Sequence, residues 1–183
     1  MLSSRVFIAL PVTGPAAEQL NQWVQAQREK LSFRKWTHPL DYHITLQFLG
    51  ETPKERIAEL HDALTKVQYK PVTLALNGGG IFGLPKAPRI LHAVISGDRE
   101  GLTALHSNIV QATKPLGFIA EDRPFTPHVT LARKFAGAER VPFSVESMES
   151  MPANVIWEAD RFVLMATHMH REPMYETLFE YRL

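Results

Sequence analysis

The tetrapeptide His43-Ile-Thr-Leu46 recurs as His128-Val-Thr-Leu131, 85 residues further along the chain. Each copy has the β-branched and apolar residues that favour a strand. The same offset carries residues 5–10 onto residues 90–95 and superimposes the helix patterns that follow them. A chance match of four residues would not bring its neighbours into the same register. The sequence therefore predicts two copies of a strand–helix–strand unit, facing each other across a pseudo-two-fold axis.

Short apolar runs predict seven strands, and three stretches with apolar residues at helical spacing predict helices. The strands are expected at residues 5–10, 42–49, 72–76, 90–95, 128–133, 155–165 and 174–182. The helices are expected to begin near residues 14, 53 and 98. Asn77-Gly-Gly-Gly80 lacks the lysine and the following helix of a phosphate-binding loop, so we expect it to form a hairpin turn.

Composition limits the class of protein. The 183 residues are 45% hydrophobic and 21% charged, which is typical of a globular domain or of two fused lobes of about 90 residues each. The net charge of +1 means that any affinity for anions must be local. The chain has no cysteine, which excludes disulfides, thiolate metal sites and cysteine nucleophiles. No signal peptide or membrane span is recognisable, so a cytoplasmic location is expected.

The repeated tetrapeptides carry the candidate chemistry. Side chains alternate between the two faces of a strand, so His43 and Thr45 point the same way, as do His128 and Thr130. If the predicted symmetry holds, two imidazoles and two hydroxyls converge on one cleft. Opening a 2′,3′-cyclic phosphodiester with water needs one group that takes a proton and another that gives one. Histidine suits both tasks because its pKa is about 6.5, and the reaction needs neither a metal nor a cofactor.

The other histidines have simpler explanations. Structural or solvated roles are expected for His61, His92, His106, His168 and His170, and His38 is a candidate for contact at the rim of the cleft. A zinc site is disfavoured because the chain has no His-Glu-x-x-His and no carboxylate two or three residues from either His-x-Thr. A serine hydrolase is disfavoured because no Gly-x-Ser-x-Gly is present.

The two motifs and their flanks resemble a known family. The stretches His43-Ile-Thr-Leu-Gln-Phe-Leu-Gly50 and Arg123-Pro-Phe-Thr-Pro-His-Val-Thr-Leu-Ala-Arg133 are similar to the paired motifs of the two-histidine phosphoesterases. The nearest group is the bacterial and archaeal RNA 2′,3′-cyclic phosphodiesterases, also called LigT-like proteins or 2′-5′ RNA ligases. The resemblance implies one bilobal α+β domain over residues 1–183, with antiparallel sheets flanking a central cleft. One lobe would hold roughly residues 1–85 with the C-terminal strands, and the other residues 86–150.

The resemblance also implies roles for individual residues. It makes His43 the proton donor and His128 the acceptor, with RNA 2′-phosphate as the product and 2′-5′ ligation as the reverse reaction. Arg133 matches an arginine that contacts the substrate phosphate, and Phe48 matches an aromatic residue that stacks on the base. Strict alternation would instead place Phe48 and Arg133 on the core face of their strands, unless a bulge re-aims them.

Two other functions stay open on the sequence. One is a cyclic phosphodiesterase for a small molecule, such as a cyclic phosphate derived from ADP-ribose. The other is a module that binds RNA ends without turnover. The expected partners are RNA ends with a 2′,3′-cyclic phosphate, including tRNA fragments, bound by a monomer that does not associate with a membrane. A basic track along RNA has only short candidates, namely Arg28, Lys30, Arg34 and Lys35.

Overall fold

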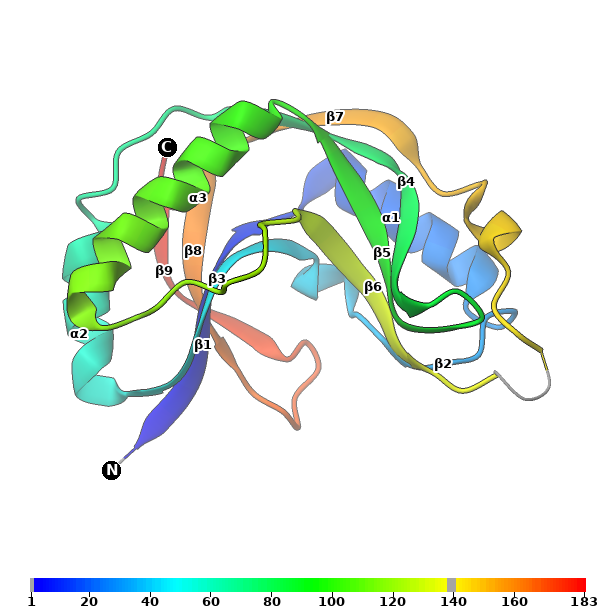
Figure 1. Cartoon of the computed structure of the whole chain (residues 1–183), viewed down its shortest axis with the longest axis horizontal. Helices are drawn as coiled ribbons and strands as arrows, with labels where there is room; N and C mark the ends of the chain where they lie inside the picture. The colour runs from blue at the N-terminus through cyan, green and yellow to red at the C-terminus, as the bar shows by residue number, and fades with distance from the viewer. Residues whose placement is uncertain (1, 138–140) are drawn as a thin grey trace.

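One antiparallel sheet runs through the molecule (Figure 1). The computed structural model describes residues 2–137 and 141–183. The strands are β1 (Ser3–Pro11), β2 (Phe33–Trp36), β3 (His43–Pro53), β4 (Val72–Leu84), β5 (Ala87–Gly97), β6 (His128–Phe135), β7 (Ala153–Ala159), β8 (Arg161–Thr167) and β9 (Tyr175–Arg182). Their order in the sheet is β7-β4-β5-β6-β3-β1-β8-β9, with β2 paired to β6. The predicted α+β fold with antiparallel strands on both sides of a cleft is therefore confirmed.

The two halves of the sheet meet at a narrow junction. Strands β3 and β6 pair through Ile44 and Val129, whereas β1 and β3 pair over nearly their whole length. Both junction residues are fully buried. Because the pairing is so short, β3 and β6 can diverge on either side of it and open the space that forms the cleft. The residue boundaries of the two lobes stay a prediction, although β4 and β7 pair on the β5 side of the junction.

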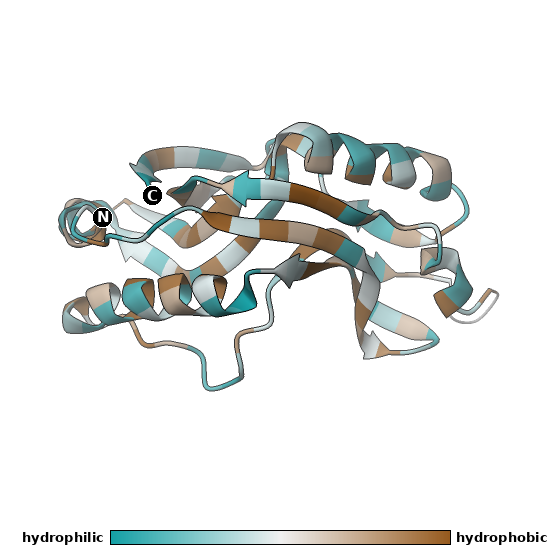
Figure 2. Ribbon diagram, turned by 90° about the horizontal axis from the view of Figure 1, so that it is seen from above, coloured by the Kyte–Doolittle hydropathy of each residue, from teal (hydrophilic) through white to brown (hydrophobic). Residues whose placement is uncertain are grey.

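Three helices cover the sheet, as the sequence predicts. They are α1 (Gly14–Gln27), α2 (Lys54–Leu64) and α3 (Arg99–Thr113). Helix α1 lies beside the β4–β7 half, where Trp23 donates to Ser150 over 3.0 Å, while α2 and α3 lie beside the β8–β9 half (Figure 1). Hydrophobic residues line the central strands and alternate with polar ones along the helices (Figure 2). In the part of the chain that the structure describes, no helix is long and apolar enough to cross a membrane.

The repeat is present, with a small change of register. Ala9 of β1 faces Thr45, and His92 of β5 faces Thr130. The first strands of the two units therefore correspond at an offset of 83 residues, while the His-x-Thr strands correspond at 85. The difference of two residues preserves the alternation of faces, so the same sides of both strands still look into the cleft.

Matching bulges interrupt alternation after each His-x-Thr motif. In β3, Ile8 faces Gln47 and Ala9 faces Thr45, which leaves Leu46 as an extra residue; in β6, Leu131 is the extra residue. A bulge shifts every later side chain to the opposite face. The bulges therefore turn Phe48 and Arg133 away from the core face that strict alternation would give them. Phe48 is 54% exposed, and both side chains line the cleft.

The expected turn at Asn77–Gly80 is wrong, because these residues lie inside β4 and the strand turns only after Leu84. Glycine is required there by close neighbours. A Cβ at Gly79 would lie 2.8 Å from the Met151 sulfur, and a Cβ at Gly80 would lie 2.6 Å from His92 Cε1. The glycine run therefore belongs to a strand that packs closely against other side chains. Composition alone cannot distinguish such a strand from a turn.

The expected strand at residues 155–165 is also wrong, since it is two strands at opposite ends of the sheet. Strand β7 pairs with β4 and β8 pairs with β1. The break falls at Asp160, which accepts hydrogen bonds from Arg161 and Arg182, each at 3.2 Å. The expected C-terminal pair is therefore β8 with β9. The edge strand β2 was not predicted, because four residues with two cations give too weak a pattern.

Candidate active site

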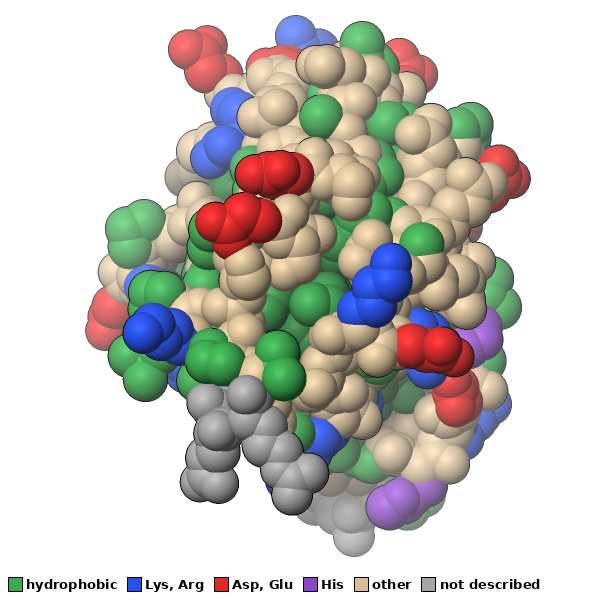
Figure 3. Space-filling model, turned by 90° about the vertical axis from the view of Figure 1, so that its right-hand side faces the viewer, with side chains coloured by type: hydrophobic (Ala, Val, Ile, Leu, Met, Phe, Trp, Pro, Cys, Tyr) green, Lys and Arg blue, Asp and Glu red, His purple; other side chains and the backbone are tan. Residues whose placement is uncertain are grey.

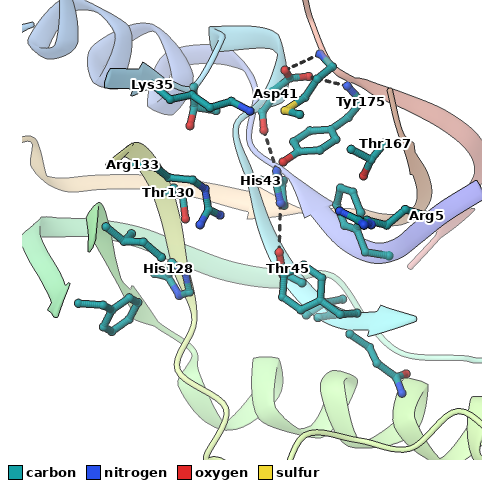
Figure 4. Close-up of a pocket in the computed structure, with 18 of the residues that line it drawn as sticks. Arg5, Lys35, Asp41, His43, Thr45, His128, Thr130, Arg133, Thr167 and Tyr175 are labelled. Atoms are coloured by element: carbon teal, nitrogen blue, oxygen red, sulfur yellow. Dashed lines mark hydrogen bonds between the residues drawn. The ribbon is translucent and has the colours of Figure 1, made fainter. Parts of the chain in front are cut away.

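A cleft of about 1190 Å³ lies between the two halves of the sheet. Strands from both repeats line it, and Figure 4 shows the histidines facing it from opposite sides. The structure brings all six predicted site residues into this one cleft, namely His43, Thr45, Phe48, His128, Thr130 and Arg133. The two bulges make this possible, because they put the fifth residue after each histidine on the same face as the histidine and threonine.

The first histidine is held at both ring nitrogens. Its Nδ1 lies 2.7 Å from the Asp41 carbonyl oxygen, which can only accept, so Nδ1 carries the proton. Its Nε2 is then an acceptor in the neutral ring and receives a hydrogen bond from Thr45 Oγ1 at 3.1 Å. The pKa of His43 is lowered to about 4, chiefly by burial, and the positive charge of Arg133 acts in the same direction. The His43 ring is therefore neutral near pH 7.

The second histidine is fixed in the same way. Its Nδ1 donates to the Thr126 carbonyl oxygen at 2.8 Å, and Thr126 precedes His128 by two residues, as Asp41 precedes His43. In both rings the other nitrogen, Nε2, is therefore available on the side of the cleft. Burial lowers the pKa of His128 as well, with the nearby arginines acting in the same direction. The duplicated strand start therefore sets the same tautomer in both halves.

The C-terminal strands complete the surroundings of His43. The Tyr175 ring meets the His43 ring edge-on at 5.1 Å, and Phe7 lies 5.0 Å away. Asp41 is only 3% exposed, and its carboxylate accepts from the backbone N–H groups of Met174 and Tyr175 at 2.9 and 3.3 Å (Figure 4). Asp41 therefore ties the β8–β9 loop to the strand that starts at His43. No sequence pattern singles out either Asp41 or Tyr175.

The model of the family described as LigT like Phosphoesterase matches residues 10–92 and 95–175, so it includes both His-x-Thr motifs. This chain belongs to the LigT-like phosphoesterases. An RNA 2′,3′-cyclic phosphodiesterase of Geobacillus stearothermophilus is 38% identical over 186 residues, covering all of this chain and 58% of that protein. One of Bacillus subtilis is 36% identical over 180 residues, covering 97% of this chain and 95% of the relative. The LigT-like chain thus spans less than two thirds of the Geobacillus relative and nearly all of the Bacillus one.

Solved structures give the same fold. The crystal structure of Escherichia coli LigT in its apo form superimposes with a TM-score of 0.79 at 24% identity, and the match covers 100% of this chain and 99% of that one. The curved sheet with a central cleft is therefore the LigT architecture. The arrangement of its strands agrees with the pseudo-symmetric repeat that the sequence predicts.

One further histidine of this LigT-like chain lies close to the site. His92 was expected to be structural; it is 5% exposed, and its ring lies 5.1 Å from that of His128 and 4.3 Å from Phe82. Burial lowers the pKa of His92 to about 4, and His128 adds to the effect. The close approach of Gly80 leaves this ring no room to move away from His128. The sequence missed this contact because His92 stands alone on its strand.

The remaining histidines divide between the cleft and the outside. His38 lines the cleft, as predicted for the rim, and its Nδ1 accepts from the Leu40 N–H at 3.1 Å. His106 and His170 also line the cleft. His61 bonds to the Tyr181 hydroxyl at 3.0 Å and His168 to Glu176 at 2.6 Å. The bond of His61 agrees with the structural role expected for it, whereas His168, expected to be solvated, is hydrogen-bonded to Glu176 at the surface.

Positive charge is concentrated around the cleft. Its basic lining residues are Arg5, Arg28, Arg34, Lys35, Arg89, Arg123, Arg133 and Arg171. The acidic ones are Asp41, Glu121 and Glu172. The chain as a whole carries only +1, so this lining is the local anion-attracting surface that the composition requires. Of the predicted basic candidates, Arg28, Arg34 and Lys35 line the cleft and Lys30 does not.

Proposed function

We propose that this chain hydrolyses 2′,3′-cyclic phosphates at the ends of RNA to 2′-phosphates. The observation that carries the proposal is the pair of histidines whose Nδ1 atoms donate to backbone carbonyls, so that both Nε2 atoms are available to one cleft. The Geobacillus and Bacillus relatives are named RNA 2′,3′-cyclic phosphodiesterases, which supports the same reaction. The cationic lining suits a phosphate-bearing substrate.

The two histidines act as base and acid. His128 Nε2 takes a proton from a water molecule, and the water oxygen forms a new bond to phosphorus. The bond between phosphorus and O3′ breaks, and His43, protonated at Nε2, gives its proton to O3′. The product carries a 2′-phosphate and a 3′-hydroxyl. His128 then returns its proton to solvent and His43 is protonated again, which balances the cycle.

The substrate itself supplies the charge that protonates the acid. In the empty cleft burial holds His43 neutral, since its pKa is about 4. A bound phosphate diester brings one negative charge next to the ring, which favours the imidazolium form. An acid that is protonated only when the anion is present is a strong proton donor toward the leaving oxygen. The positive charge of Arg133 lowers the pKa of both imidazoles and so favours the neutral form of each ring.

The other predicted residues bind the substrate in this proposal. The Thr45 and Thr130 hydroxyls and the Arg133 guanidinium hold the non-bridging oxygens as negative charge builds on them. Thr45 must release its hydrogen bond to His43 when the phosphate arrives. Phe48, more than half exposed beside the cleft, stacks on the terminal base.

RNA ligation and hydrolysis of a small cyclic phosphate are the two alternatives that use the same acid–base chemistry. The same site can also join RNA ends: a 5′-hydroxyl takes the place of water as the nucleophile on the 2′,3′-cyclic phosphate, the bond between phosphorus and O3′ breaks, and a 2′-5′ linkage with a free 3′-hydroxyl forms. The joining is feasible because the cyclic ester retains the energy of the bond that it replaces. The cleft volume of about 1190 Å³ exceeds the volume that a single nucleotide needs. This favours an RNA end over a small molecule as the substrate. The monomeric state, the cytoplasmic location, the independence of metals and tRNA fragments as substrates stay predictions.

The test uses an oligonucleotide with a 2′,3′-cyclic phosphate, incubated with the protein in EDTA. The expected product has its phosphate on O2′. His43→Gln and His128→Gln are each expected to reduce kcat by 10²-fold or more, the range of a positioned proton transfer. His61→Gln is the control, because that ring lies outside the cleft against Tyr181. Full turnover by either cleft variant would refute the acid–base pair. Binding without any product would favour the module that only binds RNA ends.

A further inference from the structure

Two cations stand side by side at one end of the cleft. Lys35 of β2 pairs directly with Arg133 of β6. Side chains of directly opposite residues share a face, with Cβ atoms about 4.5–5.5 Å apart, and like charges in such pairs destabilise the sheet. Figure 4 shows both side chains reaching toward the cleft from neighbouring strands. An anion placed between them would offset this repulsion.

The same end of the cleft carries more positive charge. Arg34 on β2 and Arg28 at the end of α1 line the cleft near Lys35. Within residues 2–137 and 141–183, no ion pair joins Arg28, Arg34, Lys35 or Arg133 to a carboxylate. By contrast, Arg5 pairs with Glu51 and Arg123 pairs with Glu121. The β2 side therefore carries uncompensated charge, as do Arg89 and Arg171, which line the same cleft.

The net charge of the whole chain is only +1, so this concentration of cations is local. On the face that Figure 3 views, the right-hand end of the molecule in Figure 1, acidic and basic side chains are interspersed with hydrophobic ones. The concentration of unpaired cations at β2 thus points to a ligand with negative charge beyond the reacting phosphate.

Because of the strand directions, the two ends of the cleft carry different side chains. Strands β3 and β6 are antiparallel and meet at Ile44 and Val129. Phe48 and Arg133 each follow their histidine by five residues, so they lie toward opposite ends. The exposed aromatic ring is thus at one end and the Lys35–Arg133 pair at the other.

We propose that Lys35, with Arg34 and Arg28 beyond it, binds the phosphodiester backbone of the RNA on the 5′ side of the terminal nucleotide. The proposal rests on the proposed function, since it assumes that the cyclic phosphate lies between the two histidines. The preferred substrate is then an RNA of two or more nucleotides, and the role of β2 is to bind the backbone of that RNA. A mononucleoside cyclic phosphate would fill the reacting end and leave the β2 end without a ligand.

The experiment compares kcat/KM for a nucleoside 2′,3′-cyclic phosphate with kcat/KM for a dinucleotide and a hexanucleotide that end in the same group. The wild type is expected to favour the dinucleotide by about tenfold or more, the scale of a charge-assisted contact. Lys35→Glu is expected to remove most of this preference, and Lys35→Arg to retain it. The effect of Lys35→Ala on the mononucleotide should stay below about fivefold, as for a screened surface charge, because this variant places no carboxylate opposite Arg133. Lys30→Glu, a charge reversal outside the cleft, should keep the wild-type ratio.

Salt provides a second readout. For single-stranded RNA, the slope of log(kcat/KM) against log[salt] should become shallower by about 0.7 for each phosphate contact that is lost. Lys35→Ala serves as a second variant, and circular dichroism checks that both fold. Equal loss on mononucleotide and dinucleotide would place Lys35 at the reacting phosphate and overturn the proposal, as would a wild type with no preference for length. A wild type that hydrolyses none of the three would instead refute the proposed function.

Discussion

Asp41 offers a test of how the fold holds its first histidine. Its buried carboxylate accepts from two backbone N–H groups of the β8–β9 loop, at 2.9 and 3.3 Å. Hydrogen bonds to charged groups contribute about 1.5–3 kcal/mol each, and the longer bond should lie at or below the lower end. Asp41→Ala is therefore expected to lower the free energy of unfolding by about 3 kcal/mol, or Tm by about 6–12 °C for a chain of this size. Asp41→Asn keeps one acceptor oxygen and should cost about half as much.

Urea unfolding followed by tryptophan fluorescence measures the change, with Asp62→Ala on the exposed face of α2 as the control. The loop carries Tyr175, which packs against the His43 ring. Loosening it should reduce kcat more than it raises KM, by about tenfold, because misplacing a catalytic group costs rate. The Asp41 carbonyl remains in both variants, so the Nδ1 hydrogen bond of His43 is not removed directly. Wild-type stability and wild-type kcat in Asp41→Ala would refute the tether.

Three further predictions follow from single contacts. Burial lowers the pKa of His43 from about 6.5 in the unfolded chain to about 4, so the unfolded state binds more protons between these pH values. Urea unfolding should therefore show the free energy of unfolding falling by about 3 kcal/mol from pH 7 to pH 4, and by less in His43→Gln. Phe48→Ala should reduce kcat/KM on a nucleoside cyclic phosphate by about tenfold through lost stacking, while thermal unfolding changes little because the ring is 54% exposed. Gly80→Ala places a Cβ 2.6 Å from His92 Cε1 and should cost about 1–3 kcal/mol in urea unfolding; an unchanged midpoint would contradict the close packing.

Periodicity predicted those parts of the fold that local residues determine. The apolar spacing of α1 and α3 and the β-branched runs of β3 and β6 place each element close to its observed bounds. The repeated His-x-Thr also predicted which side chains meet, because a duplicated strand start has only one symmetric way to face its copy. The histidine and threonine positions needed no knowledge of the rest of the chain.

The errors occur where distant segments decide the local structure. Asn77–Gly80 has turn composition, but Met151 and His92 require small residues at that point of a strand. Residues 155–165 read as one apolar run, yet β7 and β8 pair with different partners on either side of Asp160. Asp41 and Tyr175 meet only through the return of the C-terminal strands. Such features depend on tertiary contacts, which the local pattern does not contain.

The bulges explain how a symmetric scaffold carries asymmetric chemistry. Acid and base must differ, yet the two histidines share the same tautomer, the same carbonyl contact and the same adjacent threonine position. The differences enter at the position that each bulge turns into the cleft, Phe48 in one half and Arg133 in the other. One position supplies an aromatic surface for a base and the other a positive charge for a phosphate. Exchanging the phenylalanine and the arginine should therefore retain the fold but abolish productive binding, because the base and phosphate ends of the cleft would be reversed relative to the unchanged cations of β2.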